Sequence, residues 1–364
     1  MIPAERRNHI LRELRLHRAV RVGELAQKFG VAAMTIRRDL ELLEADAHLQ
    51  RVHGGAVPLR PPQGRTSRQG TPPLATVGLV VPSRNYYFPE IIRGAHVAAG
   101  ESGVRLILAI SGYSREVEQQ QIRRLAATGV DALLVTPADT VAADPSTYRL
   151  LSSLPVPVII VERSLDRADP GMPLSSVRSD QRHGAELAVR ELVERHHDRF
   201  LLAWRASPTA EAVRAGVRRA VRALRPRGHL AEVQILLAGA DPAKALLRAG
   251  EVLDAAVDLN IGALLMLPDE AVIALLEVAQ DRGIQIPQDL EIIAFDDEVS
   301  ALAPVPVTAV SPPKFAVGHT ALTSCLAHLN TPTPAGPQRT ALLPTLRERM
   351  STQPLAQPRP RTVH

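Results

Sequence analysis

The feature that most constrains this 364-residue chain is a regular alternation, after residue 75, of short apolar runs with amphipathic segments. The apolar runs indicate buried strands, and the segments between them have the apolar spacing of helices. The expected strands are approximately 76–81, 105–110, 132–136, 158–161, 199–204, 232–237, 263–267 and 291–295, and the expected helices 88–102, 117–128, 183–195, 209–224, 242–257 and 270–282. Such alternation favours parallel sheets covered on both faces. Two runs of it in tandem predict an α/β fold with two lobes.

The N-terminal residues follow a different, helical pattern. Apolar positions predict an amphipathic helix over residues 4–17, then a short helix over Val22–Phe29 that Gly30 ends. A third helix begins two or three residues later and continues to about Glu44. Two helices joined by a tight glycine turn form a helix-turn-helix, whose second helix lies in the major groove of DNA.

The third of these helices carries two consecutive arginines, Arg37 and Arg38, after Thr35. Apolar residues at 36, 40 and 43 share one face of the helix, so the arginines face solvent. A helix that buries one face and presents arginine on the other is suited to a DNA groove. A merely solvated helix face is the alternative interpretation.

A hairpin wing is expected over His48–Val57, with Gly54 and Gly55 at its turn or exit. Arg51 and His53 on this wing are available to phosphate groups or to the minor groove. The candidate DNA-binding residues are therefore Thr35, Arg37, Arg38, Arg51 and His53.

The basic excess of the chain lies at its N-terminal end. Residues 1–73 hold 13 Lys or Arg and 7 Asp or Glu, whereas the remaining residues hold 30 and 31. Attraction to phosphate requires such a local basic excess. The charge distribution therefore agrees with DNA contact through the N-terminal segment.

Composition also marks the domain boundaries. Between residues 58 and 74 the chain changes abruptly to Pro, Gly, Ser, Gln and Arg with few apolar residues, which predicts an extended linker. The Pro-rich residues after Thr352 are expected to be disordered. The expected organisation is a DNA-binding domain (1–57), a linker (58–74), a two-lobed domain (75–352) and a tail (353–364).

Several classes of protein are disfavoured. There is no run of about 18 apolar residues to indicate a membrane span, and charged first residues that begin a helix argue against a signal peptide. We expect a cytoplasmic protein without membrane contact. The single cysteine, Cys325, lies in an apolar helical pattern and is expected in the core. No His or Cys cluster has zinc spacing, so neither a metal nor a cofactor is expected.

Polar and aromatic residues follow several of the expected strands. In open α/β sheets, ligands bind beyond the carboxyl ends of the strands. Aromatic side chains that stack on an apolar face, with carboxylates and arginines for hydroxyl groups, favour a sugar-like ligand. The residues at these positions are Ser83 to Phe88, Glu162, Arg163, Asp180, Asp269, Asp296 and Asp297, with Arg214 on the helix after Trp204.

A structural alternative exists for several of these residues. Tyr87 and Phe88 could fill the interface between the lobes. Arg214 could form a surface salt bridge, since its helix carries further arginines. Asp180 and Asp269 could cap the helices that follow them.

The N-terminal segment resembles the winged helix-turn-helix of DeoR-type repressors. The resemblance covers nearly all of residues 5–57 and rests on three motifs in order, RVGELAQKFGV (21–31), TIRRDL (35–40) and LQRVHGGA (49–56). Ala32 and Ala33 stand where the family usually has a serine cap, and the loss of such a cap costs about 1 kcal/mol. Thr35 could take over the capping role.

The remainder, from about Ala75 to Thr352, resembles the periplasmic-binding-protein-like effector domain of LacI-type repressors. The motifs in the family's order include VGLVVP (77–82), RGA (93–95), VDALL (130–134), VPV (156–158), IQIP (284–287), FDD (295–297) and LLP (342–344). The resemblance implies that an effector cleft is lined by Asn85, Tyr87, Phe88, Arg163, Arg214, Asp269 and Asp296. Pro268, Glu162 and Lys314 depart from the family's usual pattern.

Together the two resemblances imply a transcriptional repressor that binds a double-stranded DNA operator and a small effector, a carbohydrate. Two-fold operators imply a homodimer, with the helices near 88–102 and 117–128 as the expected contact. The proline-rich linker cannot form the hinge helix of LacI-type proteins, so rotation of the lobes is expected to transmit the signal.

Two alternatives remain open. A glycoside-processing enzyme could be built on Asp269, Asp296 and Asp297, although no Gly-rich phosphate loop or nucleophile elbow is present. The effector domain could also be a dimeric scaffold that binds no ligand.

Overall fold

The computed structural model of the protein describes residues 6–7, 10, 13, 20–45, 49–52, 55–58, 73–166, 168–169, 172–235, 241–330 and 336–352. The chain divides into two compact units, Met1–Pro72 and Pro73–His364. Most of the helix expected over 4–17, nearly all of the expected linker and the tail after residue 352 lie outside the described residues.

The N-terminal unit combines helices with a small antiparallel sheet. Helix α2 (Val22–Phe29) is followed by α3 (Ala33–Ala45), and the strands β1 (Val20–Arg21), β2 (Leu49–Val52) and β3 (Gly55–Pro58) pair in the order β1-β3-β2. Gly30 has a φ of 64° directly after α2, a conformation that glycine adopts without strain, so it ends the helix as predicted. The short helix, the third helix and the hairpin wing are confirmed.

One apolar cluster holds this unit together. Ile36, Leu40 and Leu43 recur on one face of α3 and pack against Leu25 of α2 and against Ile10. Their period of three to four residues is that of a helix that buries one stripe. Arg37 and Arg38, on the same helix, are exposed.

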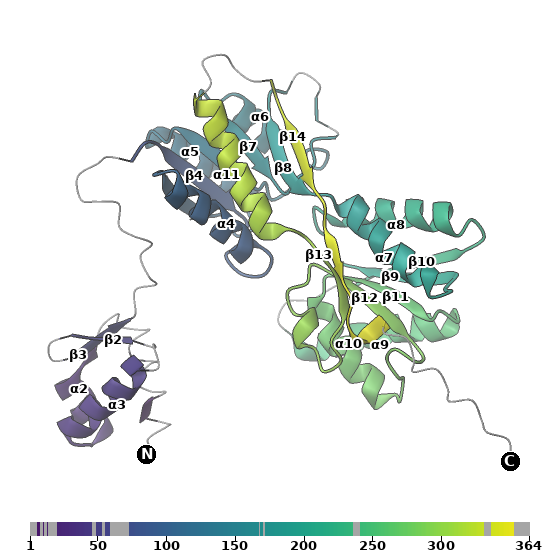
Figure 1. The fold of residues 1–364 in the computed structure, drawn as a ribbon, viewed down its shortest axis with the longest axis horizontal. Coiled ribbons are helices and arrows are strands. Elements are labelled where there is room, and N and C mark those ends of the chain that lie inside the picture. Colours follow the sequence, from purple (N-terminus) through teal and green to yellow (C-terminus); the bar gives the residue numbers. More distant parts are fainter. Residues whose placement is uncertain are drawn as a thin grey trace. The chain divides into compact units, whose positions relative to one another are not determined.

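The C-terminal unit contains two six-stranded sheets (Figure 1). The first lobe has the order β14-β8-β7-β6-β4-β5, with β4 (Thr76–Val81), β5 (Arg105–Ile110), β6 (Ala132–Val135), β7 (Val158–Val161), β8 (Ser175–Ser179) and β14 (Arg339–Leu342). The second has the order β10-β9-β11-β12-β13-β15, with β9 (Arg199–Trp204), β10 (His229–Gln234), β11 (Ala263–Leu267), β12 (Glu291–Phe295), β13 (Thr308–Ser311) and β15 (Thr345–Arg347). All neighbours are parallel except β13 and β15. The predicted α/β class with two lobes is confirmed.

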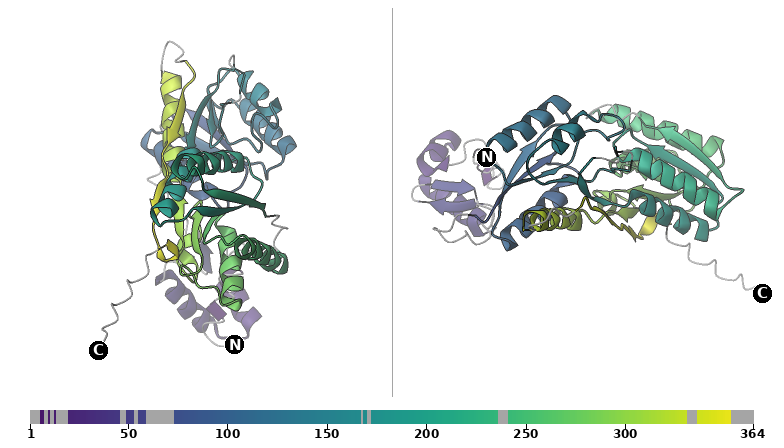
Figure 2. Two further views of the ribbon diagram at one scale, coloured as in Figure 1. Left: turned by 90° about the vertical axis from the view of Figure 1, so that its right-hand side faces the viewer. Right: turned by 90° about the horizontal axis from the view of Figure 1, so that it is seen from above.

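Helices cover both faces of each sheet (Figure 2). The first lobe has α4 (Phe88–Glu101) and α11 (Lys314–Asn330) on one face, and α5 (Arg115–Ala127) and α6 (Ser146–Ser152) on the other. The second has α7 (Gln181–Glu194) and α8 (Ala210–Leu224) on one face, and α9 (Pro242–Asp258) and α10 (Glu270–Asp281) on the other. Leu264 and Met266 face α9 and α10, whereas Leu265 and Leu267 face α7 and α8. This alternation explains why the strands are apolar throughout.

The tandem pattern predicted that one lobe follows the other along the chain, but the structure differs. The chain crosses between them after β8, after β13 and between β14 and β15. Helix α11 returns to the first lobe because Val317, Leu322 and Cys325 complete the apolar core that α4 leaves unfilled. Cys325 is buried, as expected.

Two glycines allow α4 and α11 to approach closely. A Cβ atom at Gly94 would lie 2.0 Å from the carbonyl oxygen of Phe315, and one at Gly318 would lie 1.9 Å from that of Ile91. Both distances are far below contact, so only glycine permits this crossing. The return of the chain to the first lobe therefore depends on residues more than 200 positions apart.

Strand β10 is a second departure from the predicted pattern. It begins at His229, three residues before the expected strand, and its residues are half-buried or exposed. The strand lies at the edge of its sheet and lacks the continuous apolar run of a central strand. The predicted strand was therefore placed too far toward the C-terminus, because the prediction followed the apolar residues near 236.

Candidate functional site

The third helix presents its arginines as predicted. Arg37 and Arg38 are exposed on α3, while the flanking Ile36 and Leu40 are almost completely buried. Thr35 is half-buried and stands inside the helix, which begins at Ala33, so it is not the cap that could replace the missing serine. The side chains of Arg51 and His53 lie outside the described residues, and their DNA contact stays a prediction.

A buried ion pair lies behind this exposed face. Arg6 donates from Nε to Asp39 Oδ2 at 2.6 Å and from Nη2 to Asp39 Oδ1 at 3.3 Å, and both side chains are less than a tenth exposed. This bidentate ion pair fixes α3 against the N-terminal residues of the unit. Sequence reasoning missed the pair because 33 residues separate its members.

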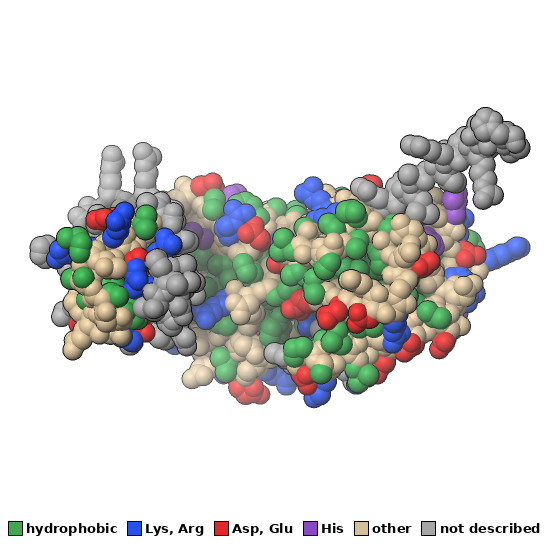
Figure 3. Space-filling view, turned by 90° about the horizontal axis from the view of Figure 1, so that it is seen from below, with side chains coloured by type: hydrophobic (Ala, Val, Ile, Leu, Met, Phe, Trp, Pro, Cys, Tyr) green, Lys and Arg blue, Asp and Glu red, His purple; other side chains and the backbone are tan. Residues whose placement is uncertain are grey.

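Charge is distributed differently on the C-terminal unit. Acidic and basic side chains are interspersed on the face of that unit seen in Figure 3. This agrees with its nearly balanced composition. The net positive charge of the chain therefore belongs to the unit that carries Arg37 and Arg38.

A cavity of about 310 Å³, here called the cleft cavity, lies between the two lobes. Its lining residues lie at or just after the carboxyl ends of strands, namely β4, β5 and β7 of the first lobe and β9, β11 and β12 of the second. The lining residues are Tyr86, Tyr87, Phe88, Tyr113, Arg163, Arg205, Ala206, Ser207, Pro208, Thr209, Leu267, Pro268 and Asp296. This is where open parallel sheets bind ligands.

An acidic pair lies at the base of the cleft cavity. The hydroxyl of Tyr86 donates to Asp269 Oδ1 at 2.7 Å and lies 3.1 Å from Asp296 Oδ2. Burial, together with the charge of Asp269, raises the pKa of Asp296 to about 7. Burial and both carboxylates also raise the pKa of Tyr86, so its hydroxyl keeps its proton and acts as a donor.

The Asp269 side chain anchors a neighbouring segment of the chain. Its Oδ2 accepts hydrogen bonds from the amides of Glu298, Val299 and Ser300 and from the Ser300 hydroxyl, at 2.7–3.0 Å. Its side chain makes no capping hydrogen bond to α10, which it precedes. Asp269 is fully buried below the cavity lining, so the structure gives it an anchoring role that neither the effector-contact nor the capping prediction described.

Hydrogen bonds to residues outside the cavity lining hold Arg163 and Tyr87 in place. Arg163 donates from Nε to the Pro137 carbonyl at 2.7 Å and from Nη1 to the Glu162 carbonyl at 2.9 Å. Glu162 accepts from the Tyr87 hydroxyl at 3.2 Å and from the Ser179 hydroxyl at 2.7 Å, and burial raises its pKa. The glutamate in place of the family's usual aspartate thus fixes an aromatic wall of the cavity.

Three predicted effector residues lie outside the cleft cavity. Asp180 caps α7 by accepting from the amides of Arg182 and His183, both at 3.1 Å. Arg214 pairs with Glu232 at 2.8 Å and stacks on Trp204 at 3.9 Å. Asn85 is exposed, and its backbone N–H donates to the Ser83 hydroxyl. Local capping, ion pairing and turn formation account for these residues, and they are not part of the candidate site.

Other lining residues were not predicted individually. Tyr86 belongs to the aromatic cluster after β4, in which Tyr87 and Phe88 were the predicted effector residues. Arg205, Ser207 and Thr209 follow β9, and Tyr113 follows β5. The same strand-end rule that selected Arg163 and Asp296 could have found all of them.

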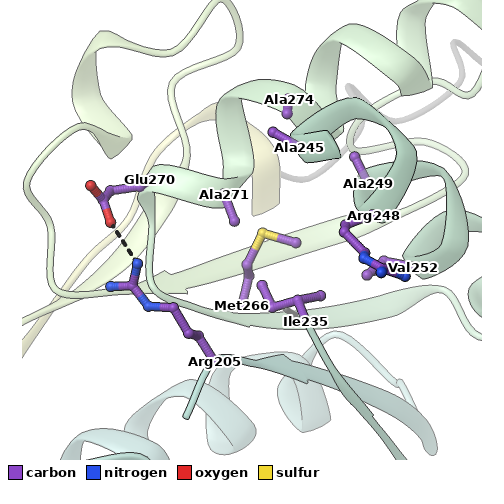
Figure 4. Close-up of a pocket in the computed structure, with 10 residues that line it drawn as sticks. All are labelled: Arg205, Ile235, Ala245, Arg248, Ala249, Val252, Met266, Glu270, Ala271 and Ala274. Atoms are coloured by element: carbon purple, nitrogen blue, oxygen red, sulfur yellow. Dashed lines mark ion pairs between the residues drawn. The ribbon is translucent and has the colours of Figure 1, made fainter. Parts of the chain in front are cut away.

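A second cavity of about 360 Å³, the outer cavity, lies between α9, α10 and the sheet of the second lobe (Figure 4). Its floor is apolar, with Ile235, Met266 and several alanines. Arg205 lines both cavities and pairs with Glu270 at 3.3 Å. Arg248, the other charged group of its lining, pairs with Glu251 at 2.6 Å.

Each of the two units matches a known protein domain. Residues 6–61 match the model of the DeoR-like helix-turn-helix domain, and residues 189–352 match that of the periplasmic binding protein-like domain. The chain is similar to the arabinose metabolism transcriptional repressor of Geobacillus stearothermophilus, with 26% identity over 81% of this chain and 80% of that repressor. It is also 26% identical to the transcriptional repressor PurR of Vibrio atlanticus, over 68% of this chain and 72% of PurR.

Solved structures support the same fold. A LacI family transcriptional regulator from Enterococcus faecium, with bound ribose, superposes with a TM-score of 0.62 at 22% identity and covers 77% of this chain and 99% of that one. The fold, the two family matches and the repressor relatives define a DNA-binding transcriptional regulator. It joins a DeoR-like helix-turn-helix to a periplasmic-binding-protein-like effector domain.

Two further observations bear on the expectations from sequence. Among the described residues, no helix is long and apolar enough to cross a membrane. Within the same part of the chain, no group of three or more His, Cys, Asp or Glu side chains could hold a metal ion.

Proposed function

We propose that the effector is a small carbohydrate bound in the cleft cavity, and that its binding changes the affinity of the protein for its operator. The observation that carries this proposal is the lining of the cavity. The cavity is lined by aromatic rings and Arg163 from the first lobe and by Asp296, Ser207 and Thr209 from the second. Rings provide apolar contact for a sugar face, and the polar groups provide partners for its hydroxyls.

The relatives support a sugar as the class of ligand. One is named for arabinose metabolism, and one structural neighbour holds ribose. The cleft cavity is formed by both lobes, so a ligand in it stabilises one relative orientation of the lobes over others. Three chain crossings between the lobes provide the hinge for such a movement.

The proposal includes a homodimer that places two DNA readers on a two-fold operator. Strand β5 is an edge strand of the first sheet and exposes Leu108, which is 42% accessible and lies in the chain between the predicted contact helices α4 and α5. Rotation of the lobes would then change the spacing of the paired readers. Effector and operator are coupled reciprocally, typically by about 1–3 kcal/mol.

Enzymatic glycoside cleavage is disfavoured by the carboxylates themselves. Asp269 accepts four hydrogen bonds through one oxygen, and Asp297 is paired with Arg349 at 2.8 Å. Of the three described carboxylates considered for catalysis, Asp296 alone is left to exchange a proton with a ligand, whereas glycosidases use two carboxyl groups. We therefore propose a binding site without catalysis.

The proposal is tested by titrating sugars against operator affinity. Full-length protein and a promoter fragment are mixed with arabinose, ribose, hexoses, disaccharides and polyols, and affinity is measured by fluorescence anisotropy. At least one sugar is expected to change operator affinity by about 5- to 150-fold, in line with typical coupling energies. The same sugar should raise the melting temperature. A panel in which no sugar alters either quantity would remove the effector proposal and favour a ligand-free scaffold.

The raised pKa of Asp296 predicts a pH dependence of sugar binding. An ionised carboxylate accepts a hydroxyl hydrogen bond more strongly than a neutral carboxyl group. Because the pKa lies at about 7, sugar affinity should fall by about tenfold from pH 8 to pH 6. Isothermal titration calorimetry across this range measures the effect.

The matched variant is Asp296→Asn, which removes the ionisation and should bind sugar weakly and without this pH dependence. An unchanged pH profile in the variant would assign the titration to another group. The same shift acts on folding with the opposite sign. A carboxyl whose folded-state pKa is raised contributes stability at low pH, and this contribution is lost as pH rises from about 4 to about 7.

A further inference from the structure

Tyr86 connects the two lobes through its side chain. The residue lies after β4 of the first lobe, whereas its hydroxyl contacts Asp269 and Asp296, which follow β11 and β12 of the second. The residue lines the cleft cavity beside Asp296. The hydroxyl therefore occupies the position from which a ligand would approach the acidic pair.

Tyr86 is also the only hydrogen-bond partner of the Asp296 carboxylate among the described residues. Lys314 lies close by, but its Nζ donates to the backbone carbonyl of Asp296 and to Glu298 rather than to the Asp296 side chain. A buried carboxylate needs a hydrogen-bond partner, because burial removes it from water. A sugar hydroxyl at Asp296 would serve the same need and would compete for the same oxygen.

The backbone at both ends of this contact is unusual. Tyr86 and Tyr87 have φ angles of 20° and 71°, and Asp296 and Asp297 have φ angles of 92° and 54°. Residues other than glycine rarely adopt positive φ, and they persist there only where surrounding contacts hold them. The contact between Tyr86 and the acidic pair is one of the interactions that hold these segments.

We propose that Tyr86 is a built-in competitor of the effector, which fastens the two lobes through Asp269 and Asp296 and leaves Asp296 when a sugar binds. This inference rests on the proposed effector function of the cleft cavity. It assigns to Tyr86 an autoinhibitory role, distinct from that of a residue that contacts the sugar. With these hydrogen bonds formed, the lobes are arranged as in the proposed sugar-bound state, because Tyr86 makes the interlobe bridge that a sugar would make.

The first test measures the bridge without any sugar. In full-length protein, spin labels at Arg149→Cys on α6 and Arg222→Cys on α8 report the arrangement of the lobes by pulsed electron paramagnetic resonance, with labelled subunits diluted into unlabelled protein. Both positions are exposed, whereas the native Cys325 is buried and should not be labelled. Tyr86→Phe should shift and broaden the distance distribution. An unchanged distribution would overturn the proposal.

The matched control is Tyr113→Phe. Tyr113 lines the same cavity, but its hydroxyl makes no hydrogen bond within the described part of the chain. This variant removes one hydroxyl from the cavity without breaking a bridge, and it should leave the distance distribution as in the wild type. An equal shift in both variants would contradict a specific role of Tyr86.

The second test measures sugar affinity with arabinose and ribose as probes. Tyr86→Phe should bind the active sugar about tenfold more tightly than the wild type, because a competing state no longer has to be displaced. Its sugar-free operator affinity should also move in the direction opposite to the effect of sugar on the wild type. Weaker sugar binding would instead make Tyr86 a direct ligand contact and overturn the proposal.

The two proposals fail separately. If neither the wild type nor any variant responds to sugar, the proposed effector function fails. If the wild type responds and Tyr86→Phe binds sugar with equal affinity, only the competition by Tyr86 is overturned.

Discussion

Replacing Arg37 and Arg38 together by alanine is expected to weaken operator binding by about a hundred- to a thousandfold. Both side chains are exposed on α3, while Ile36 and Leu40 anchor the opposite face. An arginine contact with a base edge contributes about 1–3 kcal/mol, and a contact with phosphate adds a salt-dependent share. Fluorescence anisotropy with an operator fragment at several salt concentrations measures the loss and the salt slope.

The matched control is the double substitution Arg219→Ala and Arg222→Ala, which removes two exposed arginines from helix α8 of the second lobe, a helix outside the predicted dimer contact. This variant has the same change in net charge and should bind the operator as the wild type does. A fragment that carries one half-site should bind more weakly than a two-fold operator if the protein is a dimer. Equal losses in the two double variants would mean that net charge, rather than α3, determines binding.

The substitution Arg6→Met is expected to destabilise the N-terminal unit by about 3–5 kcal/mol, because it leaves the buried carboxylate of Asp39 without its partner. The double substitution Arg6→Met with Asp39→Leu should recover most of that loss, since apolar residues of similar size replace a buried ion pair at little cost. Hydrogen exchange of the α3 amides in the full-length protein measures both effects. A loss of 3–5 kcal/mol corresponds to an acceleration of about a hundred- to a few thousandfold.

The outcome of this comparison separates two roles of Asp39. If the double variant regains stability but not operator binding, the ion pair sets the orientation of α3 as well as its stability. An exchange rate unchanged by Arg6→Met would show that the pair contributes little to the N-terminal unit. Binding that recovers fully with stability would confine the pair to a structural role.

Much of the fold follows from local patterns that the sequence displays openly. The buried strands 76–81, 158–161, 199–204 and 263–267 agree with β4, β7, β9 and β11 because central parallel strands are almost continuously apolar. Helices α2 and α3 were equally visible, because Gly30 separates two apolar stripes. Strands β8, β14 and β15 carried no such signal, since they are short and rich in Ser, Thr and Arg. Their pairing depends on neighbours far away in the chain.

The candidate site was predictable only in part for the same reason. Tyr87, Phe88, Arg163 and Asp296 follow strands and line the cleft cavity, as the strand-end rule predicts. Asp180 also follows a strand but caps a helix, and Arg214 pairs with Glu232 on the neighbouring strand. No local pattern distinguishes these outcomes, because a capping, pairing or ligand-facing side chain can have the same sequence context.

The amino-acid sequence by itself determined the two kinds of unit, the exposed arginines of α3 and the strand ends at which a ligand site could form. These properties depend on periodicity and composition over a few residues. Only the tertiary structure decided that Arg6 meets Asp39, that α11 returns to the first lobe and that Tyr86 reaches Asp269 and Asp296. Such contacts join residues 33 to more than 200 positions apart, and they form because packing of the whole chain brings those side chains together.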